Sequence, residues 1–220
     1  MSDSEMVVNL HPVVVLFVRA DSLYKAMPGV ECYDAQRNAL TWGGGCSVVA
    51  HPPCRSWGVL SHMANPRVGE KDLGPWAIEQ VRKWGGVLEH PAGSRLFRHC
   101  GCAVPDGLPD EWNGISILID QFDFGHVAHK DTILYIVGCA KLPPLPPTRM
   151  EGTDRSICGN VPGTHRCTQK QREETPVKLA EWMIEVARRS HKHNPAGLRS
   201  PRLGGDKQDP VVGRPELKEE

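Results

Sequence analysis

The sequence lacks the features of a membrane-bound or exported protein. Its longest apolar run, Val13–Val18, has the length of a strand, whereas a membrane-spanning helix needs about 20 residues. The first residues, Met1–Glu5, are acidic and polar, and so they lack the basic start of a secretory signal. These absences exclude an integral membrane protein and predict a cytoplasmic one.

An excess of charge of one sign is also absent. The 220 residues include 26 Lys plus Arg and 26 Asp plus Glu, so the formal net charge is zero. No overall basic field draws this chain onto nucleic acid, and a nucleic-acid partner must be held by a local patch. Aromatic residues are few, at 6%, whereas Gly (22) and Pro (19) are frequent. This composition favours a loop-rich α/β domain.

Eight cysteines are present. A secreted protein would use them in disulfides, but the missing signal favours a reducing compartment and free thiols. Cys100 and Cys102, together with Cys158 and Cys167, could form a structural zinc site. The Cys-x-Cys spacing is tighter than the usual Cys-x-x-Cys, and free thiols are therefore the preferred interpretation.

Hydrophobic periodicity predicts strands alternating with helices in the first half of the chain. Apolar runs predict strands at 12–18, 30–34, 47–50 and 87–88, a short helix at 22–27 and a longer helix at 71–84. The unit from 47 to 91 is thus strand, loop, helix and strand. Such a crossover favours a parallel pair of strands.

The second half predicts an antiparallel hairpin and a last helix. Ile115–Phe124 and Thr132–Val137 are β-rich runs joined by a turn-like segment. Thr175-Pro176 is typical of a helix start, and an apolar stripe follows it to Arg189. We therefore predict one α/β domain over 7–189, in which 143–174 is a short irregular insert. A disordered tail is predicted over 190–220.

Cys54 is predicted to lie on a loop just past the carboxyl end of a strand. The strand before it must stop at Pro52-Pro53, because proline removes a donor from the ladder. Ligands bind at this edge in open α/β sheets. His51 and Arg55 nearby would favour a thiolate. An inert, buried cysteine is the alternative, and the local sequence does not decide between the two.

Three short motifs follow or precede predicted strands in a fixed order. They are Pro53-Cys54, then Leu88-Glu89-His90-Pro91, then Phe124-Gly125-His126 with Lys130 before the run at 132–137. This order resembles the DNA cytosine-5 methyltransferases, and more closely the short phage-encoded proteins related to them. In that family a Pro-Cys loop supplies the nucleophile, a Glu-Asn-Val segment supplies an acid, and a third segment holds the flipped base and its phosphates.

The resemblance covers roughly residues 13–189 and carries several expectations. It implies a Rossmann-like, methyltransferase-type fold: a mostly parallel sheet with an antiparallel edge hairpin and a C-terminal helix. It implies S-adenosylmethionine as methyl donor and DNA or a nucleotide as partner, in the host cytoplasm if the chain is phage-encoded.

The chemistry of the family explains why a cysteine and a carboxyl are needed. Carbon 5 of cytosine is a weak nucleophile, and addition of a thiolate to carbon 6 activates it. Cys54 is the predicted nucleophile, with His51 and Arg55 beside it. Glu89 is predicted to protonate ring nitrogen 3, because burial would raise its pKa. The base must be flipped out of a duplex, or supplied free or single-stranded.

The remaining candidates are assigned to the donor or to the substrate. The donor candidates are Asp21, Ser22, Asp34 and Pro53, and the substrate candidates are His90, Ser94, Arg95, Gln121, His126 and Lys130. Asp34 could hold ribose hydroxyls or serve as a turn residue. A helix cap is the favoured role of Ser22. Ser94 and Arg95 could bind phosphate or cap the following turn.

The sequence departs from the family at two places. The family's donor site opens with Phe-x-Gly-x-Gly, but Phe17–Ser22 contains no glycine. The insert is too short for an ordinary target-recognition domain, although it holds a local basic patch of Arg149, Arg155, Arg166, Lys170 and Arg172. Two alternatives therefore stay open. One is base or nucleotide modification with another donor; the other is a non-catalytic DNA or host-protein binder on a decayed scaffold.

Overall fold

The computed structural model describes residues 11–157 and 161–190. The predicted tail from 191 to 220 and the first predicted domain residues, 7–10, lie outside the described residues. Ser190, which was expected to begin the tail, instead belongs to the fold. It is buried, and its carbonyl oxygen accepts a 2.8 Å hydrogen bond from the hydroxyl of Ser47.

A six-stranded sheet has the order β2-β1-β3-β4-β6-β5. The strands are β1 (Val13–Leu16), β2 (Val30–Tyr33), β3 (Ser47–Ala50), β4 (Gly86–Pro91), β5 (Ile115–Asp120) and β6 (Asp131–Val137). β1 to β4 are parallel, whereas β6 is antiparallel to both β4 and β5. The predicted α/β class is therefore confirmed: the sheet is mostly parallel, carries an antiparallel hairpin at its edge, and is compatible with a Rossmann-like fold.

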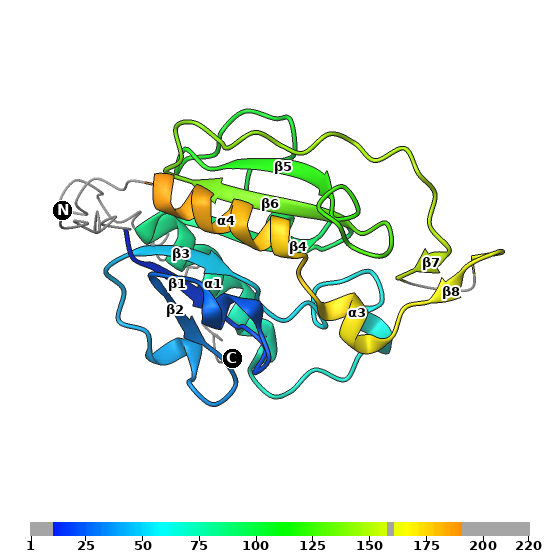
Figure 1. Cartoon of the computed structure of the whole chain (residues 1–220). Coiled ribbons are helices and arrows are strands. Elements are labelled where there is room, and N and C mark those ends of the chain that lie inside the picture. The colour runs from blue at the N-terminus through cyan, green and yellow to red at the C-terminus, as the bar shows by residue number, and fades with distance from the viewer. Residues whose placement is uncertain (1–10, 158–160, 191–220) are drawn as a thin grey trace, which may run out of the picture.

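Helices cover both faces of this sheet, as Figure 1 shows. The helices are α1 (Glu70–Trp84), α2 (Leu96–His99), α3 (Gln169–Glu173) and α4 (Val177–Arg189), with single 3-10 turns η1 (Leu23–Ala26), η2 (Ala39–Thr41) and η3 (Ser61–Met63). The long helix and the C-terminal helix lie where the sequence predicted them. No helix within the described residues is long and apolar enough to cross a membrane.

The strand side chains alternate between two hydrophobic cores. In β1, Val13 and Val15 pack on the α4 side with Leu179 and Met183, whereas Val14 and Leu16 pack on the α1 side. Successive side chains of a strand point to opposite faces, so a strand covered on both faces must be apolar throughout. The uninterrupted apolar runs of the sequence thus follow from the three-layer architecture.

The insert is more regular than predicted. It contains β7 (Arg155–Ser156), which pairs in parallel with β8 (His165–Arg166), and the short helix α3. Thr168 begins α3 with a capping box, in which Thr168 and Gln171 each bond the other's backbone N–H. Figure 1 places α3 beyond the edge of the sheet, close to the loop that follows β3.

The strand order creates a crevice at the carboxyl ends of β1 and β3. The chain passes from β1 to a neighbour on one side, β2, and then returns to β3 on the other side. The loops after β1 and β3 therefore diverge, and ligands bind at such a switch point in open α/β sheets.

Candidate active site

A cavity of about 620 Å³ lies at this switch point. Its walls come from the loops after β1 and β3, the end of β4, the residue before β6, and α3. Of the predicted site residues, it brings together Asp21, Ser22, His51, Pro53, Cys54, Arg55, Glu89, His90 and Lys130. The two chemical candidates, Cys54 and Glu89, both line this cavity.

Cys54 is exposed on the loop after β3, one residue past Pro52-Pro53. The cavity wall removes water from around its thiol, and the carboxylate of Glu89 adds a negative charge nearby. Together these effects raise the pKa of the Cys54 thiol, although the charges of Lys130 and Arg55 oppose them. The predicted thiolate is therefore not favoured in the free protein.

Arg55 has a structural role besides the one predicted. Its guanidinium binds both carboxylate oxygens of Glu70, at 2.8 and 2.6 Å. Glu70 is the first residue of α1 and is buried. The bidentate ion pair fixes the Cys54 loop against α1, so Arg55 positions Cys54 in addition to lowering the pKa of its thiol slightly.

Glu89 lies inside β4, opposite Leu134 of β6, rather than on a loop after the strand. Burial alone would raise its pKa. The hydrogen bond with His51, at 3.2 Å, and the charges of Lys130 and His51 outweigh that effect and lower the pKa of Glu89 to about 2. The prediction that Glu89 is a neutral acid is thus wrong for the free site, because its neighbours lower its pKa and keep the carboxylate ionised.

A chain of hydrogen bonds runs through Glu89. On one side, His51 Nε2 lies 3.1 Å from the hydroxyl of Tyr24. On the other side, the Gln121 amide donates to Glu89 at 2.9 Å and to the Thr132 hydroxyl at 3.0 Å. Gln121 therefore holds the carboxylate from behind. Tyr24 and Thr132 were missed by the sequence analysis, since nothing local marks a residue that acts through a distant partner.

His90 is buried at the cavity wall, with an exposed fraction of 1%. Burial lowers its pKa to about 4, although the charge of Glu89 and the backbone of Pro53 oppose the shift. The Pro53 backbone acts through a hydrogen bond to the ring that is too long or too bent to count as a full one, and neither ring nitrogen has a well-formed hydrogen bond within the described part of the chain. Buried polar groups without a partner are costly, and they are found where a ligand completes the site.

Four of the predicted substrate residues lie outside the cavity lining, and Gln121, which binds Glu89 from behind, is one of them. The hydroxyl of Ser94 accepts from the N–H of Leu96, the first residue of α2, at 3.1 Å. Arg95 donates to the hydroxyl of Ser61 at 2.5 Å. His126 is buried, and its Nε2 lies 2.8 Å from the carbonyl oxygen of Gln171. It joins the β5–β6 connection to α3, so it supports the cavity from outside.

The residues after β1 and β2 do not fit S-adenosylmethionine as the resemblance implied. One oxygen of Asp34 accepts from the backbone of Gln36 and Arg37, and the other binds Lys25 at 2.6 Å. Asp34 thus stabilises its own turn, and three of the roughly four hydrogen bonds that its carboxylate can accept are already made within the chain. Ser22 caps η1, as favoured, by accepting from the N–H of Tyr24 at 3.4 Å.

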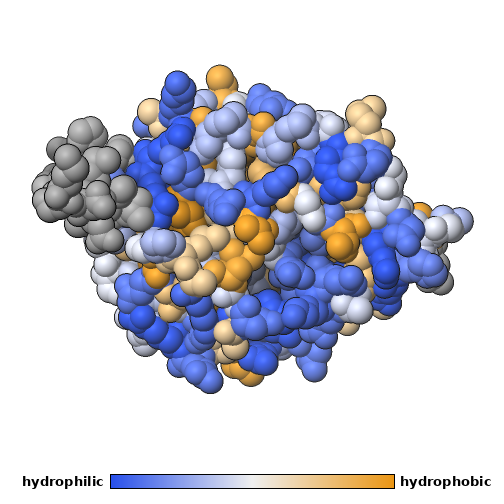
Figure 2. Space-filling view, in the orientation of Figure 1, coloured by the Kyte–Doolittle hydropathy of each residue, from blue (hydrophilic) through white to orange (hydrophobic). Residues whose placement is uncertain are grey.

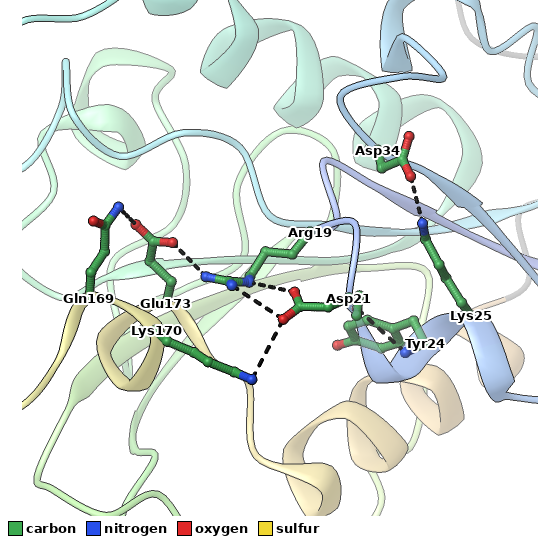
Figure 3. A network of polar contacts seen from close by, with 9 residues as sticks. Arg19, Asp21, Tyr24, Lys25, Asp34, Gln169, Lys170 and Glu173 are labelled. Carbon is green, nitrogen blue, oxygen red and sulfur yellow. Dashed lines mark hydrogen bonds and ion pairs between the residues drawn. The ribbon is translucent and has the colours of Figure 1, made fainter.

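An ion-pair cluster at the cavity mouth joins the loop after β1 to α3 (Figure 3). Arg19 binds Asp21 at 2.9 Å and Glu173 at 2.7 Å, and Lys170 lies 3.7 Å from Asp21. We call Arg19, Asp21, Lys170 and Glu173 the mouth network. In Figure 2, which has the orientation of Figure 1, the surface at the lower right, where α3 lies, is mainly hydrophilic. The donor candidate Asp21 is therefore occupied by cations of its own chain.

Of the cysteines proposed for zinc, Cys100, Cys102 and Cys167 lie in the described part of the chain. Cys102 lies 3.6 Å from a guanidinium nitrogen of Arg82, which also donates to the Cys100 carbonyl. Cys167 is buried, and Cys158 lies outside the described residues. Within 11–157 and 161–190, no group of three or more His, Cys, Asp or Glu side chains is placed to hold a metal ion.

Comparisons with known proteins add no relative to this picture. No protein-family model matches the chain, and no curated protein matches it significantly. Function must therefore be argued from the cavity and its residues.

Proposed function

We propose that the chain modifies a pyrimidine base, in the manner of a cytosine-5 methyltransferase, through covalent attack by Cys54 on carbon 6. The observation that carries this proposal is that Cys54 and Glu89, from two neighbouring strands, line one cavity at the switch point of the sheet. A nucleophile and a polar partner that share a cavity are the minimum that such addition needs.

The residues of the cavity suggest how the base is held and activated. Ionised Glu89 accepts hydrogen bonds from the N–H groups on the Watson–Crick edge of a pyrimidine. The Cys54 thiol first loses its proton to solvent. The thiolate sulfur then bonds to carbon 6, and the electron pair of the 5,6 double bond moves into the ring. Lys130, whose positive charge acts on both Cys54 and Glu89, balances that negative charge.

The proposal does not specify which group is transferred to carbon 5. Because Asp34 and the glycine-free turn after β1 do not fit S-adenosylmethionine, a donor of another class is favoured over a methyl sulfonium. The covalent step itself is independent of the donor, and it is the step to test.

Exchange of the hydrogen on carbon 5 tests the covalent step without any donor. Addition of Cys54 makes carbon 5 basic, so it takes a deuteron from deuterated water; loss of its proton and release of sulfur then restore the base. We expect deuterium at carbon 5 of deoxycytidine 5′-monophosphate or of cytosine in a single-stranded oligonucleotide, measured by mass spectrometry of the recovered nucleoside.

The matched control uses two cysteines that flank the same strand. Cys54→Ser should abolish exchange, whereas Cys46→Ser, just before the other end of β3, should leave it unchanged. If the folded wild-type protein exchanges neither substrate, the covalent proposal fails and a non-catalytic binder becomes the better description.

A further inference from the structure

Helix α3 covers the part of the cavity through which a duplex would have to enter. Gln169, Lys170, Arg172 and Glu173 of α3 are part of the lining, and the mouth network ties this helix to the loop after β1. Two carboxylates of that network, Asp21 and Glu173, also stand at the entrance. A duplex would have to displace α3 and bring its phosphates towards these negative charges.

Two cations of the lining are not engaged by carboxylates. Arg19, Arg55 and Lys170 all form ion pairs. By contrast, Lys130 and Arg172 make no salt bridge within the described residues. The Arg172 Nε is in addition buried without a hydrogen-bond partner there. A buried guanidinium nitrogen without a partner marks a place for an anion.

The wall formed by β4 offers a group for a base. Glu89 presents an ionised carboxylate close to Cys54, whereas the buried ring of His90, the next residue of the strand, packs edge-on against Phe97 of the α1-side core. The cavity therefore combines an anion-binding part, Lys130 and Arg172, with a base-binding part, Glu89 and Cys54. A volume of about 620 Å³ lies in the range of small-molecule sites.

From this arrangement we propose that the substrate is a free pyrimidine nucleotide, with its phosphate held by Lys130 and Arg172 and its base by Glu89 beside Cys54. The inference rests on the proposed function. It narrows the class of substrate from DNA or a nucleotide to a nucleotide alone. It also explains why the chain needs neither a target-recognition domain nor an overall positive charge.

Calorimetric titration of the full chain tests the assignment. The ligands are deoxycytidine 5′-monophosphate, deoxycytidine, and a single-stranded and a duplex oligonucleotide that contain cytosine. We expect the monophosphate to bind most tightly, and the nucleoside to bind at least about tenfold more weakly, because it lacks the charge-assisted hydrogen bonds.

The variants separate a phosphate site from a general loss of charge. Arg172→Ala should weaken binding of the monophosphate about tenfold and leave deoxycytidine binding unchanged, whereas Lys130→Ala should weaken binding of the monophosphate by at least as much. Lys178→Ala, which removes an exposed lysine of α4, should leave both affinities unchanged. Circular dichroism confirms that each variant is folded.

Several results would overturn the assignment. They are tighter binding of either oligonucleotide than of the monophosphate, equal affinity for monophosphate and nucleoside, or no binding of the monophosphate. The failures of the two proposals are distinguishable, because binding does not require the thiol. Monophosphate binding without deuterium exchange would refute only covalent attack, and exchange confined to oligonucleotides would refute only the nucleotide assignment.

Discussion

Glu89 has only 13% of its side chain exposed and yet has a lowered pKa, because His51 and Gln121 bind its two oxygens and Lys130 adds a positive charge. A carboxylate in this state is a hydrogen-bond acceptor at neutral pH, not an acid. In the proposed reaction, Glu89 would therefore orient a base through its N–H groups.

The depressed pKa of Glu89 predicts an acid-labile contribution to stability. With a folded-state pKa of about 2 and an ordinary value of 4.5, the carboxylate stabilises the fold above pH 4.5, and this contribution is lost as the pH falls towards 2. The loss amounts to a few kcal/mol, since one pKa unit corresponds to about 1.4 kcal/mol. Urea unfolding at pH 5, 4 and 3 measures it.

The neutral variant Glu89→Gln provides the comparison. It should lose less unfolding free energy than the wild type between pH 5 and 3. Glu181→Gln, at an exposed position of α4, should follow the wild type. Parallel curves for the wild type and Glu89→Gln would show that the carboxyl is not held ionised by the fold.

The raised pKa of the Cys54 thiol predicts the pH dependence of the covalent step. Only the thiolate attacks, so the rate of deuterium exchange at carbon 5 should rise with pH from 6 up to at least 9, the ordinary pKa of a thiol. Initial rates across this range, at saturating deoxycytidine 5′-monophosphate, measure it. A rate already constant above pH 7 would contradict the raised pKa.

At the residue scale, the sequence predicted that Cys54 and Glu89 lie in one site, but it did not predict their pKa values. Cys54 and Glu89 could be placed because each accompanies a recognisable strand end. Their pKa values depend on Lys130, His51 and the cavity wall, and these contacts join segments far apart in the chain. Arg172 was recognised only as part of a basic patch, because its buried nitrogen depends on the fold of α3.

Among the elements, α3 is held by few and mostly exposed contacts. Its links to the rest of the fold include the mouth network and the contact between His126 and the carbonyl of Gln171. Exposed ion pairs contribute roughly 0–1 kcal/mol each and are weakened by salt. Helix α3 should therefore open more easily than the sheet beneath it.

Arg19→Ala tests this expectation, because Arg19 contacts both Asp21 and Glu173. We expect faster amide hydrogen exchange across 169–175 and a change in global unfolding free energy below about 1 kcal/mol. High salt should have the same local effect on the wild type. Arg37→Ala, which removes another surface ion pair, with Glu31, is the control and should leave α3 exchange unchanged.

If Arg19→Ala left the exchange of 169–175 unchanged, the mouth network would not hold the cover closed. If the variant instead lost several kcal/mol of global stability, α3 would be part of the core rather than a cover.

The strands and long helices could be predicted, whereas α3, β7 and β8 could not. β1 and α4 carry apolar patterns whose period reflects burial on the sheet. α3 exposes most of its side chains, and its start depends on the capping box between Thr168 and Gln171. β4 also continues to Pro91, beyond the predicted Val87-Leu88, because pairing with β6 extends it.

The whole molecule consists of two cores that share one sheet. α4 covers one face and contacts β1, β3 and β4, whereas α1 covers the other face. Because the strands contribute side chains to both cores, loss of packing on one face also weakens the other. A single cooperative unfolding transition is therefore expected.

Leu179→Ala in α4 tests the contribution of this packing. Leu179 is completely buried against the sheet, so the variant should lose about 2–5 kcal/mol of unfolding free energy in urea denaturation. Lys178→Ala, at the exposed neighbouring position, should change it by less than about 0.5 kcal/mol. A loss below 1 kcal/mol for Leu179→Ala would mean that α4 is loosely packed.

The bond between Ser47 and Ser190 has a practical consequence. Ser47 begins β3, and Cys54 follows its other end. The last described residue, Ser190, therefore lies at the amino-terminal ends of the parallel strands, and the cavity lies at their carboxyl ends. The chain also enters β1 at the amino-terminal ends, at Val13, which pairs with Ser47. A protein immobilised through a site engineered beside Ser190 would therefore present its cavity to the solution, which suits a surface-based nucleotide-capture assay.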